Sequence, residues 1–209
     1  MTRQRIVQKG PRKDLQGFPA RRFGGSFYRA ARQAPWWFCR CGGCRFDVLN
    51  TTDPLVGTLY VGTDVLTGVM EVIGPELLGR TIGIRHLRDR ALWQLAYDRA
   101  LELADTCHSK AVAFGVTNEL ATMVPYDIPQ QWALAFNEAE WDGISYRTRF
   151  MTGPSATGLA LFDAAGSHAD WISQDLGSAA DDDIISDLLA VGVEVLMTAP
   201  HSSEFEELS

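Results

Sequence analysis

The chain has 209 residues, of which 46% are hydrophobic, and its formal net charge is −7. This hydrophobic fraction is enough for a substantial core, so folding does not require a disulfide or a metal ion merely for stability. The acidic balance disfavours a sequence-independent nucleic-acid binder, which would usually be basic.

The sequence also argues against a membrane or exported protein. It contains no apolar run near the roughly 20 residues of a membrane span, and its N-terminus lacks the apolar segment of a signal peptide. We therefore expect a cytoplasmic protein without membrane contact. The four cysteines are expected to remain reduced in that compartment.

Composition divides the chain into three parts. Residues 1–25 are basic and rich in glycine and proline, which predicts an N-terminal arm. Residues 26–200 have the composition of a single folded domain. Residues 201–209 are polar and acidic, which predicts a flexible tail.

The first predicted elements are a short strand and a helix. Residues 57–62 are rich in β-formers and bounded by glycines, which indicates a strand. Asp64 is a candidate N-cap for the helix that follows, and Gly74-Pro75 is expected to end it. The apolar residues of this helix recur at helical spacing: Leu66, Val69, Met70 and Ile73.

A second helix is predicted over residues 89–106, and residues 111–116 fit either a strand or a helix end. A third helix is predicted over residues 130–140, with an inward face. The predicted stripe of the second helix is Leu92, Leu95, Ala96, Arg99 and Leu103, and the inward residues of the third are Trp132, Phe136 and Ala139.

The last third of the chain mixes strands with one helix. Residues 143–151 alternate between two faces, residues 158–162 are an apolar strand candidate, and residues 193–197 predict a final strand. A helix is predicted over residues 184–191, with the acidic run 181–183 at its N-terminus. One face of the alternating segment carries Ile144, Tyr146, Thr148 and Phe150. Strands and helices without regular alternation predict an α+β fold rather than a doubly wound sheet.

Three of the cysteines fall within the stretch "FCRCGGCRFD", residues 38–47. Cys41-x-x-Cys44 has the spacing of one zinc-ligand pair, but the only candidate for a second pair, Cys107-His108, lacks that spacing. A redox Cys-x-x-Cys would open a helix, and none is predicted after Cys44. We therefore expect no metal site here, although a zinc-stabilised interaction domain remains an alternative.

Motifs of several common enzyme classes are absent from the sequence. It contains neither a phosphate-binding Gly-x-x-x-x-Gly-Lys-Ser/Thr loop nor a Gly-x-Ser-x-Gly nucleophile elbow. Its four histidines are scattered, and no pair has the spacing of helical metal ligands. These residues alone leave the function open.

Several short motifs, taken in order, are more informative. Arg45 follows a Gly-rich turn, Tyr60 lies in a predicted strand with the pattern Gly-Thr-x-Tyr, and Glu71 lies in the helix predicted after it. The full set is Tyr28-Arg29, Cys44-Arg45-Phe46, Gly57-Thr58-Leu59-Tyr60, Met70-Glu71, "WDGISYRTRF" over residues 141–150 and "GLALFD" over residues 158–163. In this order the motifs resemble the RES domain. Thr148 stands where that family usually has serine, and Cys44 where it usually has glycine.

The resemblance implies a fold similar to ADP-ribosyltransferase toxins, with twisted β-sheets flanked by helices. It also implies the toxin of a type II toxin–antitoxin system that degrades NAD+ by cleaving the nicotinamide–ribose bond, with water or phosphate as acceptor. NAD+ would be the substrate, and no cofactor or metal is expected. The implied partner is an Xre-type helix-turn-helix antitoxin, with no direct contact to nucleic acid.

The resemblance assigns catalytic roles to Arg45, Tyr60 and Glu71, and NAD-binding roles to Arg29 and Thr148. The residue types suit that chemistry. A carboxylate can stabilise the oxocarbenium character that develops on the ribose, and Glu71 projects off the apolar stripe of its helix. Arginine presents a fork of donors that matches a pyrophosphate.

Other interpretations of the same residues remain open. The same site could transfer ADP-ribose to a protein, or the chain could be a catalytically inactive binding module. The arginines and the glutamate could be solvated surface charges, and Tyr60 could be a core residue. The oligomeric state is also open, with a homo-oligomer among the alternatives.

Overall fold

The structure is a computed structural model that describes residues 8–32, 34–49, 55–153 and 156–197. Strands and helices are mixed along the chain, which confirms the predicted α+β fold. The strands are β1 Ala20–Phe23, β2 Ser26–Ala31, β3 Trp37–Phe38, β4 Val56–Gly62, β5 Thr81–Gly83, β6 Ala91–Ala96, β7 Leu101–Asp105, β8 Gly143–Arg147, β9 Thr157–Ala164, β10 Gly166–Ser167, β11 Ser173–Ser178 and β12 Glu194–Leu196. The α-helices are α1 Val65–Ile73, α2 Arg85–Arg88, α3 Asp127–Glu138 and α4 Asp182–Ala190, and the 3₁₀ helices are η1 Gly74–Glu76, η2 Ser109–Phe114 and η3 Asn118–Ala121.

An eight-stranded mixed sheet forms the centre of the fold, in the order β1-β7-β8-β9-β4-β2-β6-β11. β4 pairs with β9 in an antiparallel ladder from Val56 opposite Ala164 to Gly62 opposite Gly158. By contrast, β2 and β4 are paired at one position, Tyr28 opposite Gly62. The sheet therefore diverges between β2 and β4, next to α1.

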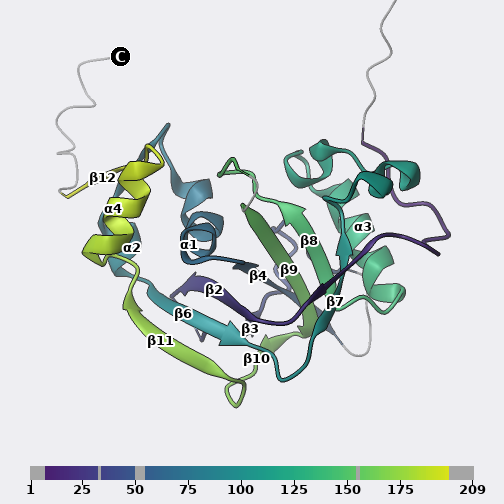
Figure 1. Cartoon of the computed structure of the whole chain (residues 1–209), viewed down its shortest axis with the longest axis horizontal. Coiled ribbons are helices and arrows are strands. Elements are labelled where there is room, and N and C mark those ends of the chain that lie inside the picture. Colours follow the sequence, from purple (N-terminus) through teal and green to yellow (C-terminus); the bar gives the residue numbers. More distant parts are fainter. Residues whose placement is uncertain (1–7, 33, 50–54, 154–155, 198–209) are drawn as a thin grey trace, which may run out of the picture.

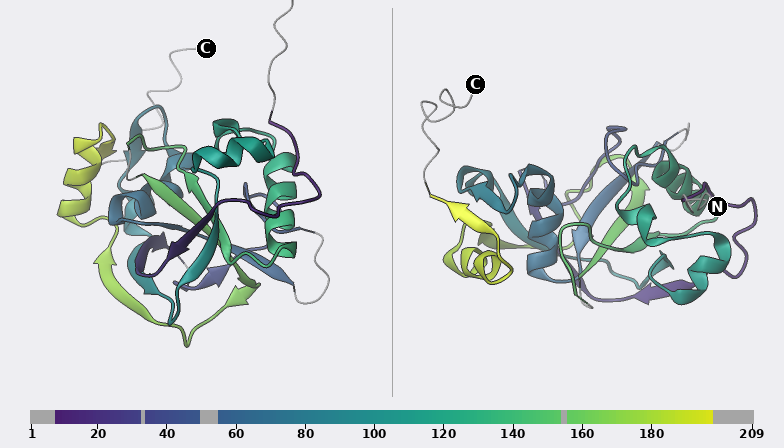
Figure 2. Two further views of the ribbon diagram at one scale, coloured as in Figure 1. Left: turned by 45° about the vertical axis from the view of Figure 1, so that its right-hand side comes forward. Right: turned by 90° about the horizontal axis from the view of Figure 1, so that it is seen from above.

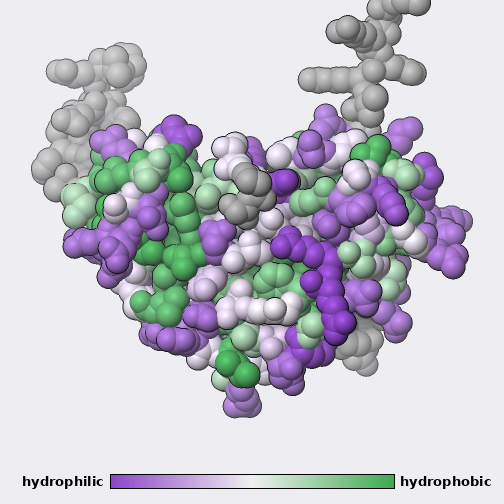
Figure 3. All heavy atoms as spheres, in the orientation of Figure 1, coloured by the Kyte–Doolittle hydropathy of each residue, from purple (hydrophilic) through white to green (hydrophobic). Residues whose placement is uncertain are grey.

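α2 and α4 lie at one end of the molecule and α3 at the other (Figure 1), and both further views show the same separation (Figure 2). α1 packs on β2 and β4, between these ends. The space-filling view shows a concave upper outline between these ends, with hydrophobic side chains gathered over the end that carries α2 and α4 (Figure 3). β4 and β9, in the middle of the sheet, are buried along most of their length.

The N-terminus of α1 and the contact of α1 with the sheet are both determined by nearby residues. The side chain of Asp64 accepts a hydrogen bond from the backbone N–H of Thr67 at 2.8 Å, so the predicted N-cap is confirmed. Two glycines let the helix approach the sheet closely. A Cβ on Gly68 would lie 2.4 Å from the carbonyl oxygen of Tyr28, and one on Gly62 would lie 2.2 Å from the backbone nitrogen of Gly68. This contact fixes α1 over β2 and β4.

The prediction of a helix over residues 89–106 is wrong. The segment forms two strands, β6 and β7, which do not pair with each other: β6 lies between β2 and β11, and β7 between β1 and β8. Its apolar residues matched a helical period, but neighbouring strands on both edges of each segment supply the backbone hydrogen bonds. Tertiary pairing of this kind commonly overrides local preference.

Most other predicted elements are confirmed with small changes in their ends. The strands at 57–62, 158–162 and 193–197 correspond to β4, β9 and β12, and the helix at 184–191 corresponds to α4. Asp181 is the N-cap of α4, and its side chain accepts a hydrogen bond from the backbone N–H of Asp183. The remaining differences are local: residues 111–114 belong to η2, which ends before Gly115, and Ala139 is exposed instead of inward.

The alternating segment 143–151 is a strand only as far as Arg147. Ile144, Tyr146 and Thr148 are buried as predicted, but Ser145 on the opposite face is buried too. Its hydroxyl accepts a hydrogen bond from Nη1 of Arg21 at 3.1 Å. The Arg21 side chain, from β1, reaches this face of β8 across β7.

The predicted N-terminal arm is in part a component of the domain. β1 pairs with β7, Phe18 is buried, and the buried Gln8 accepts a hydrogen bond from the N–H of Thr117 at 2.8 Å. Residues 1–7, the end of the domain at 198–200 and the predicted tail at 201–209 lie outside the described residues. Among the helices described, none combines the length and apolar character that a bilayer span demands.

Candidate active site

A cavity of about 850 Å³ lies where β2 and β4 diverge, bordered by α1 and by the loops that follow β3 and β8. Its volume falls in the range of about 300–1,000 Å³ that is usual for ligand sites. Four of the five predicted site residues line it: Arg29, Arg45, Tyr60 and Glu71. Three other hollows, of about 470 to 570 Å³, contain none of the five.

Glu71 is held by a tyrosine from the neighbouring sheet. The Tyr146 hydroxyl donates a hydrogen bond to Oε2 of Glu71 at 2.5 Å, and the Tyr146 side chain is only 1% exposed. Burial raises the pKa of Glu71 above its usual value, while the bond from Tyr146 and the charge of Arg45 act in the opposite direction. The result is a fixed carboxylate that faces a cavity and has one oxygen oriented by a neutral donor.

A glycine in β9 makes room for this tyrosine. Gly158 lies opposite Tyr146 in the β8–β9 ladder. A Cβ on Gly158 would lie 2.6 Å from Cζ of Tyr146 and 2.8 Å from its hydroxyl oxygen. The absence of a side chain at this position therefore lets the ring lie across β9 toward Glu71.

The loop before β4 carries Arg45 and orders Tyr60. The backbone N–H of Phe46 donates to the Tyr60 hydroxyl at 2.6 Å, and the Thr58 hydroxyl donates to the carbonyl of Phe46 at 2.9 Å. The Arg45 guanidinium lies over the ring of Tyr126, 5.1 Å from its centroid. Nε of Arg45 is buried without a hydrogen-bond partner among the described residues, so this group retains donor capacity.

Arg29 supplies a second cation on the side of β2. Its Nη1 donates to the carbonyl of Pro35 at 2.9 Å, which orients the guanidinium. Burial lowers its pKa to about 10, so Arg29 remains charged at neutral pH. Two arginines, a carboxylate and aromatic rings thus surround one cavity, a combination suited to an anionic substrate with a reacting cationic centre.

Thr148 is placed differently from the other four. It does not line the cavity, and its hydroxyl donates to the carbonyl oxygen of Met151 at 3.5 Å. The next two residues, Arg149 and Phe150, line the cavity instead. Phe150 also contacts the end of α1, since a Cβ on Gly74 would lie 2.2 Å from its ring.

Sequence reasoning missed Tyr146 and Tyr126 as site residues. Tyr146 shares a predicted face with Ile144, Thr148 and Phe150, and a tyrosine on such a face is usually a core residue. Its partner Glu71 lies 75 positions earlier in the chain, and no local pattern links the two. Tyr126 precedes α3 and reaches Arg45 only through the fold.

The comparison with known families decides the classification. The family model of the RES domain matches residues 11–181, most of the chain. The chain belongs to the RES domain family. The fold is also similar to that of a solved structure, the crystal structure of the MbcT–MbcA toxin–antitoxin complex of M. tuberculosis, with a TM-score of 0.53 at 14% identity over 78% of this chain and 90% of that one. No curated protein matches the chain.

Proposed function

We propose that this RES domain is a toxin that degrades NAD+ by cleaving the bond between nicotinamide and ribose. The observation that carries the proposal is the oriented carboxylate of Glu71 in the same cavity as Arg45, Arg29 and Tyr60. A carboxylate beside a cavity with two guanidinium groups fits a substrate that combines a pyrophosphate with a cationic glycosidic centre.

In the reaction, the bond between the anomeric carbon and the nicotinamide nitrogen breaks, and its electron pair neutralises the pyridinium ring. Positive charge develops on the ribose, where the Glu71 carboxylate stabilises it. An oxygen of water or phosphate then forms the new bond to the anomeric carbon. When water is the acceptor it loses a proton, and the raised pKa of Glu71 suits a group that accepts one.

Arg29 and Arg45 would bind the pyrophosphate. Arg45 has an unused buried donor at Nε and a guanidinium plane held by Tyr126, and Arg29 is oriented by its bond to Pro35. The Tyr60 hydroxyl is occupied by the N–H of Phe46, so its ring would contact the nicotinamide or the ribose. Thr148 would act at the margin of the site, through the loop that carries Arg149.

The partner in this proposal is an antitoxin of the Xre helix-turn-helix type that covers the cavity. The related fold of MbcT was solved in a toxin–antitoxin complex, and a cavity open to one side can be blocked by a bound protein. Such a toxin requires no nucleic-acid contact of its own.

Nicotinamide release from NAD+ by the purified chain tests the activity. We expect turnover without any acceptor protein, and a loss of about 100-fold or more in Glu71→Gln, because the variant keeps the shape of the side chain and removes the charge. Glu138→Gln, at an exposed position of α3, is the matched control and should retain full activity.

The product identifies the acceptor. ADP-ribose formed in the absence of phosphate indicates water, whereas a phosphorylated ADP-ribose formed in its presence indicates phosphate. Label from NAD+ appearing on protein, with no free ADP-ribosyl product, would replace this proposal with protein ADP-ribosylation. No consumption of NAD+ by the folded wild-type chain would refute both.

A further inference from the structure

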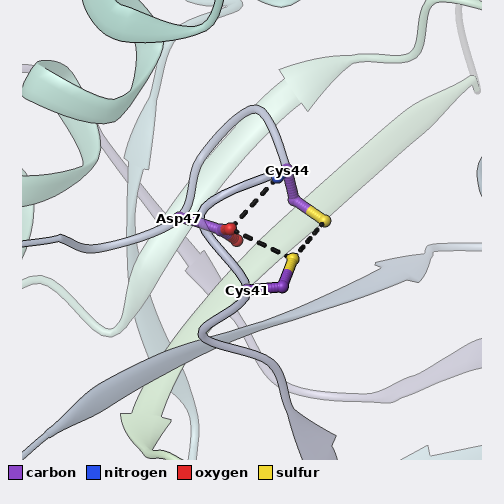
Figure 4. A group of neighbouring side chains, drawn as sticks. All are labelled: Cys41, Cys44 and Asp47. Carbon is purple, nitrogen blue, oxygen red and sulfur yellow. Dashed lines mark hydrogen bonds between the residues drawn. The ribbon is translucent and has the colours of Figure 1, made fainter.

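The loop between β3 and β4 brings two thiols and a carboxylate together beside the cavity. Sγ of Cys41 lies 3.5 Å from Sγ of Cys44 and 3.4 Å from Oδ2 of Asp47. Figure 4 shows the three side chains converging on one point from the two sides of the turn. One ligand-type atom from each residue lies within 4.8 Å of the others.

Asp47 is the unusual member of this group. The residue is 0% exposed, yet its Oδ1 has no hydrogen-bond partner among the described residues. Its other oxygen accepts from the backbone N–H of Cys44 at 3.1 Å and from the Cys41 thiol. A buried carboxylate oxygen without a partner is costly, so Asp47 retains capacity to bind a group that the described residues do not supply.

Two of the three pairwise distances are close to those around a tetrahedral thiophilic ion, and the third pair lies within 4.8 Å. Sulfur ligands at about 2.3 Å and oxygen ligands at about 2.0 Å from zinc lie about 3.5–3.8 Å from one another in tetrahedral geometry. The distances of 3.5 and 3.4 Å in the loop are close to that range. Two thiolates also select a thiophilic ion over calcium or magnesium, which prefer oxygen ligands.

We propose that Cys41, Cys44 and Asp47 form a binding site for a thiophilic divalent cation of the zinc type. The Cys-x-x-Cys pair is evident in the sequence, and the only candidate for a second ligand pair there was Cys107-His108, which is exposed. The third ligand is Asp47 instead, three residues after Cys44. The thiol of Cys39 interacts with that of Cys41 and borders the site.

The ion would have a structural task. It would close the turn at Gly42, whose φ of +72° suits glycine, and hold the loop that carries Arg45 into the cavity. Gln130 already fixes the same turn from α3, through bonds from Nε2 to the carbonyls of Gly42 and Cys44, both at 3.0 Å. None of the three ligands is among the residues proposed to contact NAD+, although Cys44 lines the same cavity. The site can therefore exist whether or not the chain degrades NAD+.

A disulfide between Cys41 and Cys44 is the rival explanation for the short sulfur–sulfur distance. It would require an oxidant, and it would leave the buried Asp47 carboxylate without a counter-ion. The metal site accounts for the thiols and the carboxylate together.

Cobalt and zinc binding to the purified full-length chain tests the proposal. The chain is reduced, freed of metal with a chelator and titrated with Co²⁺, whose visible spectrum reports tetrahedral thiolate ligation. We expect saturation at one equivalent and displacement of Co²⁺ by Zn²⁺. Deprotonation of the thiols on binding should also release protons.

Three variants distinguish a loss of metal binding from a loss of folding. Cys41→Ser and Asp47→Asn should each weaken Zn²⁺ binding by about 100-fold or more, whereas Cys107→Ser should bind as the wild type does. Asp47→Asn keeps the shape of the side chain, so it serves if the cysteine variant does not fold. The proposal is overturned if Co²⁺ gives no thiolate spectrum, if Asp47→Asn binds Zn²⁺ with unchanged affinity, or if the isolated protein contains a Cys41–Cys44 disulfide and takes up no metal.

Discussion

At the scale of single residues, the contact between Tyr146 and Glu71 determines the properties of the site. Glu71 is buried enough for its pKa to rise, and the Tyr146 hydroxyl opposes that rise by donating to the ionised form. The pKa of Tyr146 itself is raised well above its usual value, by burial first and by the charge of Glu71 second. The tyrosine therefore stays neutral and remains a donor over the whole pH range of ordinary assays.

This contact predicts the pH dependence of a Tyr146→Phe variant. Loss of the hydroxyl removes an interaction that favours the carboxylate, so the pKa of Glu71 should rise further. If the proposed reaction needs ionised Glu71, activity falls as the pH drops through this pKa, and the acidic limb of kcat/KM should move to higher pH in the variant. The measurement is nicotinamide release between pH 4 and pH 9, and an unmoved limb would show that Glu71 does not set it.

At the scale of elements, the position of Glu71 depends on how closely α1 approaches the sheet. Gly68 lies one turn before Glu71, and its missing side chain allows contact with the backbone of β2 at Tyr28. Helical propensity alone favours alanine over glycine by about 1 kcal/mol. The close contact instead favours glycine at this position, because the backbone carbonyl of Tyr28 belongs to a paired strand and its displacement would cost free energy.

We expect the close contact to dominate in a Gly68→Ala variant. Unfolding in urea should show a destabilisation of about 1–3 kcal/mol, as is usual for overpacking, with a lower midpoint and an unchanged slope. Activity should fall as well, since α1 would shift with Glu71. Gly25→Ala is the control, because a Cβ there has open space around it. Equal stability of Gly68→Ala and the wild type would mean that α1 adjusts freely.

Local chemistry explains which elements could be predicted. α1 has an N-cap and an apolar stripe, and α4 has a capping aspartate, so both are specified by nearby residues. β6 and β7 are specified by strands that pair with them from elsewhere in the chain, and their composition did not distinguish them from a helix. β1 and β11 were missed for the same reason, as edge strands whose polar residues resemble loops.

The candidate site also combines residues that sequence motifs could identify with contacts that depend on distant parts of the chain. The resemblance to the RES domain identified Arg29, Arg45, Tyr60 and Glu71 from ordered motifs, and the structure places all four around one cavity. Contacts made across the sheet were not accessible, because the pairing of Tyr146 with Gly158 depends on the register of β8 and β9. Asp47 was overlooked since its sequence neighbours gave no reason to count a carboxylate with the two thiols.

At the scale of the whole molecule, α2 and α4 lie at one end and α3 at the other (Figure 1), and the outline between these ends is concave (Figure 3). The cavity lies where β2 and β4 diverge. The proposed toxin would have to be active alone and silent in complex, and a cavity meets both needs if a partner covers it. The acidic net charge of −7 does not oppose NAD+ binding, because Arg29 and Arg45 provide a local positive site.

Cellular NAD+ after induced expression tests the central claim most directly. Wild type and Glu71→Gln are expressed in bacteria to equal protein levels, and NAD+ is measured in extracts over time alongside growth. The account predicts that NAD+ falls and growth stops with the wild type, while both remain near the uninduced level with Glu71→Gln. Unchanged NAD+ in cells that accumulate folded wild-type protein would contradict it, as would an equal loss of NAD+ with the variant.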